Sequence, residues 1–148
     1  MSGPDADTRG RITRAWSATS EAVPAGLWPT ITIAEDSDPS TGSNLYLVGP
    51  RLLPVEGPVP AADAPFSVIV GLTAALGAAA LGECPACHRV ADICGNDPEP
   101  DRGAFYVYDV DVRVDHHMAC PAADVRELTQ WLCPPYGTAE NPYLKGGS

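Results

Sequence analysis

The chain has 148 residues, of which 19 are acidic and 9 are basic, so its formal net charge is −10. This length suits one domain or slightly more, with a modest core that a bound metal ion would help to stabilise. A nucleic-acid ligand requires a basic surface, and Arg9, Arg11 and Arg14 form the only local basic cluster. The composition therefore argues against DNA or RNA as a direct ligand and favours a protein partner with a basic surface.

The cysteine content and the N-terminus indicate a compartment. The first residues lack the basic start and apolar run of a secretory signal. The chain has five cysteines, an odd number. Two pairs of potential ligands, each separated by two residues, suit a metal site better than a secreted disulfide framework. We therefore expect a protein of the reducing cytoplasm.

The N-terminal part predicts one helix and two strands. Apolar residues recur at helical spacing over 11–23, and Pro24 would end that helix. Residues 30–34 and 44–48 have strand patterns, and the polar, turn-rich segment between them predicts an antiparallel pair.

A proline-rich stretch suggests how the chain is divided. Residues 50–65 hold five prolines and are typical of an extended linker. The predicted organisation is an N-terminal helix and β segment over 1–49, a linker over 50–65, and an apolar helix with a metal-binding unit over 66–148. One compact domain is the alternative.

Residues 64–82 contain no charged residue, which approaches the length of a membrane span. Nearly half of the run is Ala and Gly, and it lacks the flanking Lys and Arg that orient a spanning helix, so a buried helix is the preferred interpretation. Asp63 would be its N-cap, with Pro65 in the first turn. Small residues at i, i+4 spacing would allow close packing against the chain's own sheet or, as a homodimer, against a second copy: Gly71, Ala75 and Ala79.

Two strands are predicted in the C-terminal half, over 88–93 and 105–116. In the second, even-numbered residues are apolar and acidic residues alternate with them, which predicts one buried and one solvated face. The acidic face and the preceding loop form a candidate docking surface: Asp109, Asp111 and Asp115, with Asp97, Glu99 and Asp101.

The most informative motif consists of two ligand pairs, Cys84-Pro-Ala-Cys87 and His117-Met-Ala-Cys120. Two pairs of this spacing, on separate pieces of backbone, match what a tetrahedral zinc ion requires. The predicted site is Cys3His, with a structural Zn²⁺ on Cys84, Cys87, His117 and Cys120. His116 is the alternative histidine.

The predicted order is a cysteine turn, two strands and then a helix that starts at the second ligand pair. This order resembles a treble-clef zinc finger over about residues 83–133. The resemblance is architectural and implies no particular activity, because treble clefs serve nucleases, ribosomal proteins and interaction modules alike. The chain also offers spare ligands outside the simple pattern: His88, Cys94, His116 and Cys133.

Several other chemistries remain open. Cys84-Pro-Ala-Cys87-His88 matches a haem-attachment pattern, with Met118 as an axial ligand, and Cys-Pro-Ala-Cys also resembles a thiol redox pair. An iron–sulfur cluster could use Cys84, Cys87, Cys94 and Cys120, because cysteine spacing separates it poorly from zinc. Asp109 and Asp111, two apart on one strand, could hold Mg²⁺ in an enzyme, although no phosphate-binding loop or nucleophile motif accompanies them.

Together these features predict a small acidic α+β protein with an antiparallel sheet, a few helices and a C-terminal zinc unit. Its closed set of ligands leaves no position for a substrate water, which favours a role through protein–protein contacts, as an adaptor, regulator or inhibitor, over catalysis.

Overall fold

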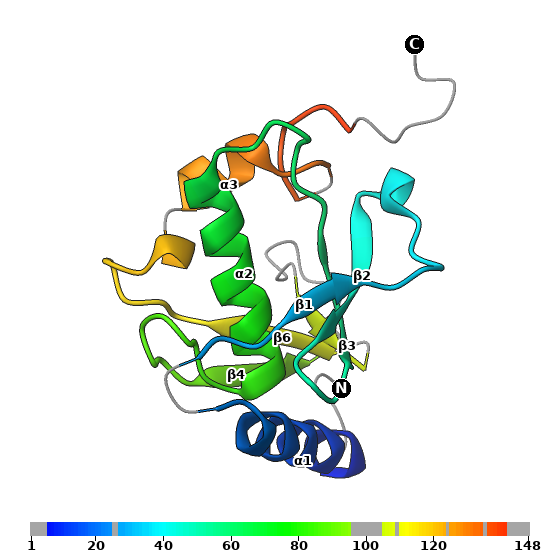
Figure 1. Cartoon of the computed structure of the whole chain (residues 1–148), viewed down its shortest axis with the longest axis vertical. Helices are drawn as coiled ribbons and strands as arrows, with labels where there is room; N and C mark the ends of the chain where they lie inside the picture. The colour runs from blue at the N-terminus through cyan, green and yellow to red at the C-terminus, as the bar shows by residue number, and fades with distance from the viewer. Residues whose placement is uncertain are drawn as a thin grey trace.

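The computed structural model describes residues 6–24, 27–95, 105–108, 110–123, 125–134 and 136–141. Within these residues the chain is α+β, with an antiparallel six-stranded sheet and three α-helices (Figure 1). The helices are α1 (Ala6–Ala22), α2 (Phe66–Leu81) and α3 (Val125–Trp131), and the short 3₁₀ helices are η1 (Pro39–Thr41) and η2 (Pro121–Ala123). The strands are β1 (Ile31–Ile33), β2 (Ser43–Val48), β3 (Leu53–Pro58), β4 (Ala91–Gly95), β5 (Tyr106–Val107) and β6 (Val110–Val114).

The sheet has the strand order β1-β2-β3-β5-β6-β4. Burial alternates along β2, where Asn44, Tyr46 and Val48 are buried and their neighbours are not, as expected of a sheet with one face on the core. The predicted strands at 30–34 and 44–48 are confirmed, and they pair antiparallel.

Strand β3 lies within residues 50–65, the range that the sequence predicts as a linker. The backbone is extended there, but it pairs with β2 on one side and β5 on the other. The Leu45 carbonyl accepts from the N–H of Ala34, which directly follows β1, so the backbone of Leu45 bonds on the β1 side. The backbone of Leu47, two residues on, faces the same side, and its β3 partner Pro54 therefore needs no hydrogen bond to β2. The sheet thus continues through the proline-rich segment.

Helix α2 packs against the sheet. Helix α1 lies at the C-terminal end of α2, and η2 and α3 lie along the N-terminal half of α2 (Figure 1). The main core joins Ile12 of α1 and Leu72 and Leu76 of α2 to apolar side chains of the sheet. The prediction of a buried helix is confirmed, with ten buried residues in α2. Among the described residues, no helix combines the length and the apolar character needed to cross a membrane.

The ends of α2 differ from the prediction at one point. Pro65, with φ −62° and ψ 157°, is the N-cap, and no side chain caps the helix. Asp63 therefore does not cap it, because the helix begins two residues later than a cap at Asp63 would require. At the other end Gly82 adopts φ 79° and donates its N–H to the Ala78 carbonyl, a left-handed cap that glycine favours.

The strand predicted over 105–116 is instead a hairpin, so that prediction is wrong. Val107 pairs with Val110 and Tyr106 with Asp111, and Tyr108 adopts φ 50° at the turn. A two-residue turn places Tyr106 on the same face as Asp111, although their positions in the alternating pattern predict opposite faces.

This hairpin also changes the predicted acidic surface. Asp111 is only 4% exposed and its carboxylate lies 2.9 Å from the Arg113 guanidinium, so it does not belong to a solvated face. Asp115 is exposed. The other members of the predicted docking surface lie outside the described residues: Asp97, Glu99, Asp101 and Asp109.

Candidate metal centre

The first two cysteines lie in a tight turn between α2 and β4. The turn is closed by backbone hydrogen bonds from the Cys84 N–H to the Arg89 carbonyl (2.9 Å) and from the His88 N–H to the Cys84 carbonyl (2.8 Å). His88 adopts φ 62°, a left-handed conformation that costs a non-glycine residue energy. Because the turn follows directly on the Gly82 cap, the cysteines are positioned by the end of α2.

The other two candidate ligands lie between β6 and α3. His116 follows the last residues of β6, and Cys120 immediately precedes η2. The Cys120 N–H donates to the His117 carbonyl (2.8 Å), and the Ala123 N–H donates to the Cys120 carbonyl (2.9 Å). These bonds fold the chain so that the Cys120 thiol turns back toward the end of the strand.

Helix α2 fixes this second segment by close backbone packing. A Cβ built on Gly71 would lie 2.6 Å from the Pro121 carbonyl oxygen and 3.2 Å from Leu128 Cδ2. The absence of a side chain at Gly71 therefore allows η2, and with it Cys120, to approach α2. The partner of the small-residue stripe at this position is the chain's own η2 and α3.

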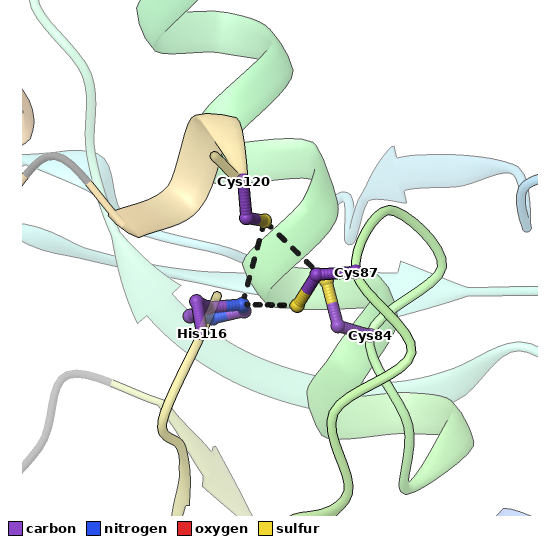
Figure 2. A group of neighbouring side chains, drawn as sticks. All are labelled: Cys84, Cys87, His116 and Cys120. Atoms are coloured by element: carbon purple, nitrogen blue, oxygen red, sulfur yellow. Dashed lines mark hydrogen bonds between the residues drawn. The ribbon is translucent and has the colours of Figure 1, made fainter. Parts of the chain in front are cut away.

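The four donor atoms are close enough to share one ion (Figure 2). Sγ of Cys84, Cys87 and Cys120 and the nearer ring nitrogen of His116 all lie within 4.8 Å of one another. Cys84 Sγ is 3.8 Å from Cys120 Sγ, and His116 Nδ1 is 3.6 Å from both Cys87 Sγ and Cys120 Sγ.

These separations can be compared with those of a zinc tetrahedron. Zn–S bonds of about 2.3 Å and Zn–N bonds of about 2.1 Å at tetrahedral angles give S···S edges of about 3.8 Å and S···N edges of about 3.6 Å. The three distances in the cluster match these edges, and the S···S distance is far longer than the roughly 2.05 Å of a disulfide. The residues present thus fit a single tetrahedral metal ion.

The histidine at this centre is His116. The sequence preferred His117, whose side chain is exposed and whose Nδ1 accepts the Ala119 N–H at 3.1 Å. Strand parity explains the outcome, because His116 continues the even-numbered positions of β6, where Val110 and Val112 are 2% exposed and face the core. The alternation along the strand was the sequence signal that favoured His116, but the spacing of the ligand pair favoured His117 and decided the prediction.

The electrostatics of the cluster suit a cation. Burial raises the pKa of Cys120 to about 12, and the neighbouring Cys84 and Cys87 act in the same direction. Burial also acts to raise the pKa of Cys87, but hydrogen bonds from the His117 and Arg89 backbone N–H groups and from the other two thiols lower it overall. Burial lowers the pKa of His116 against the opposing effect of Asp115, which favours the neutral imidazole that a metal requires.

The haem-attachment pattern does not fit this geometry. Cys84 is fully buried beside Cys120, whereas the side chain of His88 is 74% exposed and contacts Glu83 at 3.4 Å. Met118, the imagined axial ligand, is 89% exposed. Thiols and histidine thus point in different directions, and no common haem face is formed.

The other thiol chemistries fare differently. In a [4Fe–4S] cluster each thiolate binds a different iron, whereas the distance between Cys84 and Cys120 is that of two ligands on one ion. The side chain of Cys94 lies outside the described residues. Cys133 is buried away from the cluster, with its thiol 3.8 Å from the Glu140 carbonyl oxygen. The Cys-Pro-Ala-Cys turn follows α2 rather than opening a helix, unlike a thiol redox motif.

The predicted carboxylate pair is not assembled by the described residues. Asp109 lies outside them, and Asp111 is held by Arg113 through both Nε (3.0 Å) and Nη2 (2.9 Å). Both contacts go to Oδ2 of Asp111, so Arg113 would compete with Mg²⁺ for that oxygen.

Comparisons of the chain with protein-family models, with curated proteins and with solved structures found no match. The arguments about function therefore come from the geometry of the chain itself.

Proposed function

We propose that Cys84, Cys87, His116 and Cys120 bind one Zn²⁺ ion in a structural role. The observation that carries the proposal is one S···S distance and two S···N distances, which match edges of a zinc tetrahedron, in a cluster whose donor atoms all lie within 4.8 Å of one another. Four protein ligands complete the coordination and leave no position for a substrate water. The ion would supply a cross-link, and no reaction is assigned to it.

The position of the centre supports this structural role. Cys84 and Cys120 are 36 residues apart in the sequence, and they join the C-terminal end of α2 to the segment between β6 and α3. A metal that closes such a long loop restricts the unfolded chain and stabilises the fold. The order of the elements is that of a treble clef, with β5 as an addition. The cysteine turn comes first, then the antiparallel strands β4 and β6, and then Cys120 at the start of a helical segment.

We further propose that the protein acts through protein–protein contacts, as an adaptor, regulator or inhibitor, rather than as an enzyme. The closed coordination supports this role, and the net charge of −10 favours a partner with a basic surface. Three reduced thiols at one centre suit a reducing compartment, and we place the protein in the cytoplasm on that ground.

The metal assignment is tested by zinc content and visible absorption of the purified protein and two variants. Cys120→Ser removes a ligand, and Cys133→Ser is the matched control because it alters another buried thiol outside the cluster. We expect one colourless zinc per chain, retained in Cys133→Ser and lost in Cys120→Ser. Iron with visible absorption, or equal zinc in both variants, would contradict the assignment.

The interaction role is tested by affinity capture with the zinc-loaded protein after nuclease treatment. A partner bound through its basic surface should be released as the salt concentration rises, because screening weakens contacts between exposed charges. Capture that depends on nucleic acid, or a partner with no basic surface, would argue against this part of the proposal.

A further inference from the structure

A hollow of about 930 Å³ lies between α1 and the cysteine turn, outside the metal centre. Its walls come from α1, the segment after α1, the end of α2 and the turn from Glu83 to Val90. We call it the α1 groove; its apolar lining includes Trp16, Leu27, Trp28, Pro85 and Val90. Its volume falls in the range of pockets that bind small molecules and peptide side chains.

Both long walls of the α1 groove are held against α2. Trp16 donates its indole N–H to the Ala79 carbonyl at 2.7 Å, and its ring covers Gly82, where a Cβ would lie 2.7 Å from the indole. On the opposite wall, Pro85 of the cysteine turn contacts Gly77, where a Cβ would lie 3.0 Å from the proline ring. The groove is therefore built into the packing of the fold.

Three of the eight exposed large apolar side chains in the described residues line this groove. Leu27 is 61% exposed, Val90 is 68% exposed and Trp28 is 37% exposed. Large apolar side chains gathered around a hollow mark an interaction site more often than the same residues scattered singly. Apolar contacts would thus provide the main driving force for an occupant.

The charges at the groove are of one sign. Glu21 and Glu83 line it, whereas its described lining includes no Lys or Arg. Its single basic side chain, His88, already contacts Glu83. An occupant with positive charge beside an apolar side chain would complement this lining, and an acidic occupant would be repelled.

The shape indicates an extended chain. The α1 wall runs from Thr13 to Glu21, eight residues further along the helix, which corresponds to about 12 Å at 1.5 Å per residue. At about 3.3 Å per residue, an extended peptide would place roughly four residues along it. The exposed hydroxyls of Ser17 and Ser20 on this wall can bond to a peptide backbone.

We propose that the α1 groove binds a short extended segment of a partner protein, in which an apolar side chain is flanked by Lys or Arg. The inference rests on the proposed role in protein–protein contacts and names the surface and the chemistry of the partner. The apolar side chain would pack on Leu27, Trp28 and Val90, and the basic residue would lie near Glu21 and Glu83.

The probe is a displayed library of random heptapeptides, selected on the immobilised protein as purified. We expect the enriched peptides to combine Lys or Arg with Leu, Phe or Trp. Each enriched peptide is then measured against two pairs of variants. Glu21→Lys is compared with Glu56→Lys, an equal charge change at an exposed position outside the groove, and Leu27→Ser with Ile33→Ser, which is 56% exposed.

Binding should weaken about tenfold in Glu21→Lys, since an attractive contact becomes repulsive, and several-fold in Leu27→Ser, with both controls unchanged. The proposal is overturned if no peptide is enriched, if basic residues are not selected, or if the groove variants bind like their controls. It is also overturned if the groove is occupied by a second copy of the chain, which sedimentation would show. Zinc content measured on the same samples separates a failure of this proposal from a failure of the metal centre.

Discussion

Gly71→Ala tests how tightly the fold determines the metal centre. In the middle of a helix, replacing Gly by Ala ordinarily stabilises a protein by about 0.5–1 kcal/mol. At Gly71 the added Cβ would lie 2.6 Å from the Pro121 carbonyl oxygen, so η2 must recede by about 0.4 Å to restore even a 3.0 Å contact. Overpacking of this kind costs roughly 1–3 kcal/mol, so the net effect should be a loss of about 0.5–2 kcal/mol.

The same displacement would reach the proposed metal site, because Pro121 follows Cys120 directly. A ligand shift of this size exceeds the roughly 0.2 Å tolerance of a well-formed zinc site, so zinc affinity should fall by about tenfold. Urea unfolding of the zinc-loaded protein gives the free energy of unfolding, and competition with a chelating dye gives the affinity.

Gly10→Ala is the control, since its Cβ would approach only the flexible end of Arg14, at 3.0 Å. This variant should be as stable as the wild type or more stable by up to about 1 kcal/mol, with unchanged zinc affinity. If Gly71→Ala behaved in the same way, close packing of α2 on η2 would not be what positions Cys120.

Three further predictions concern single residues. His116→Asn should lower zinc affinity by about two orders of magnitude, because one of four ligands provides about a quarter of the roughly 10–16 kcal/mol of a structural site. His117→Asn, which retains an acceptor for the Ala119 N–H, should change the affinity little. Equal losses in a zinc competition assay would refute the choice of His116 as the ligand. His88→Gly should raise stability by about 1 kcal/mol in urea unfolding, because glycine adopts φ 62° without strain, and should retain zinc; loss of the metal would show that His88 has a role as a ligand. Burial raises the pKa of Cys133 above its ordinary 9.0, so the thiolate forms first in the unfolded chain. The free energy of unfolding should therefore fall as pH rises through about 9. Zinc-loaded Cys133→Ala should lack this part of the decline, and identical pH profiles of the two proteins would contradict the prediction.

The elements that the sequence predicted correctly depend on local patterns. Alternation identified β1 and β2, and the uncharged Ala- and Gly-rich run identified α2 as a buried helix. The sequence grouped the three cysteines of the candidate centre because each predicted ligand pair is close in sequence, and the structure brings these cysteines together. Each of these features can be recognised from residues that are close together in the sequence.

The errors arose where pairing across the sheet decides the structure. A two-residue turn at Tyr108 leaves the alternation of apolar residues uninterrupted, so the hairpin resembled one long strand and Asp111 appeared solvated. Strand β3 was predicted as part of a linker because of its prolines. They are tolerated in the sheet because they need no hydrogen bond to β2, which depends on how β1, β2 and β3 are paired. The choice between His116 and His117 likewise depends on which face of β6 meets the cysteine turn.

Helix α2 connects the metal centre with the α1 groove. Near its middle, Gly71 admits η2 and so places Cys120, while its last turns, at Gly77, Ala79 and Gly82, support Pro85 and Trp16. A helix with larger side chains at these positions could not hold both neighbours at this distance, which explains why the helix carries Gly or Ala there. Zinc bound to Cys84 and Cys87 would hold the turn that carries Pro85, and so one wall of the groove, without contributing a ligand to it. On the two proposals together, the metal would affect recognition by fixing the position of a surface, and the bound ion could be essential while remaining chemically inert.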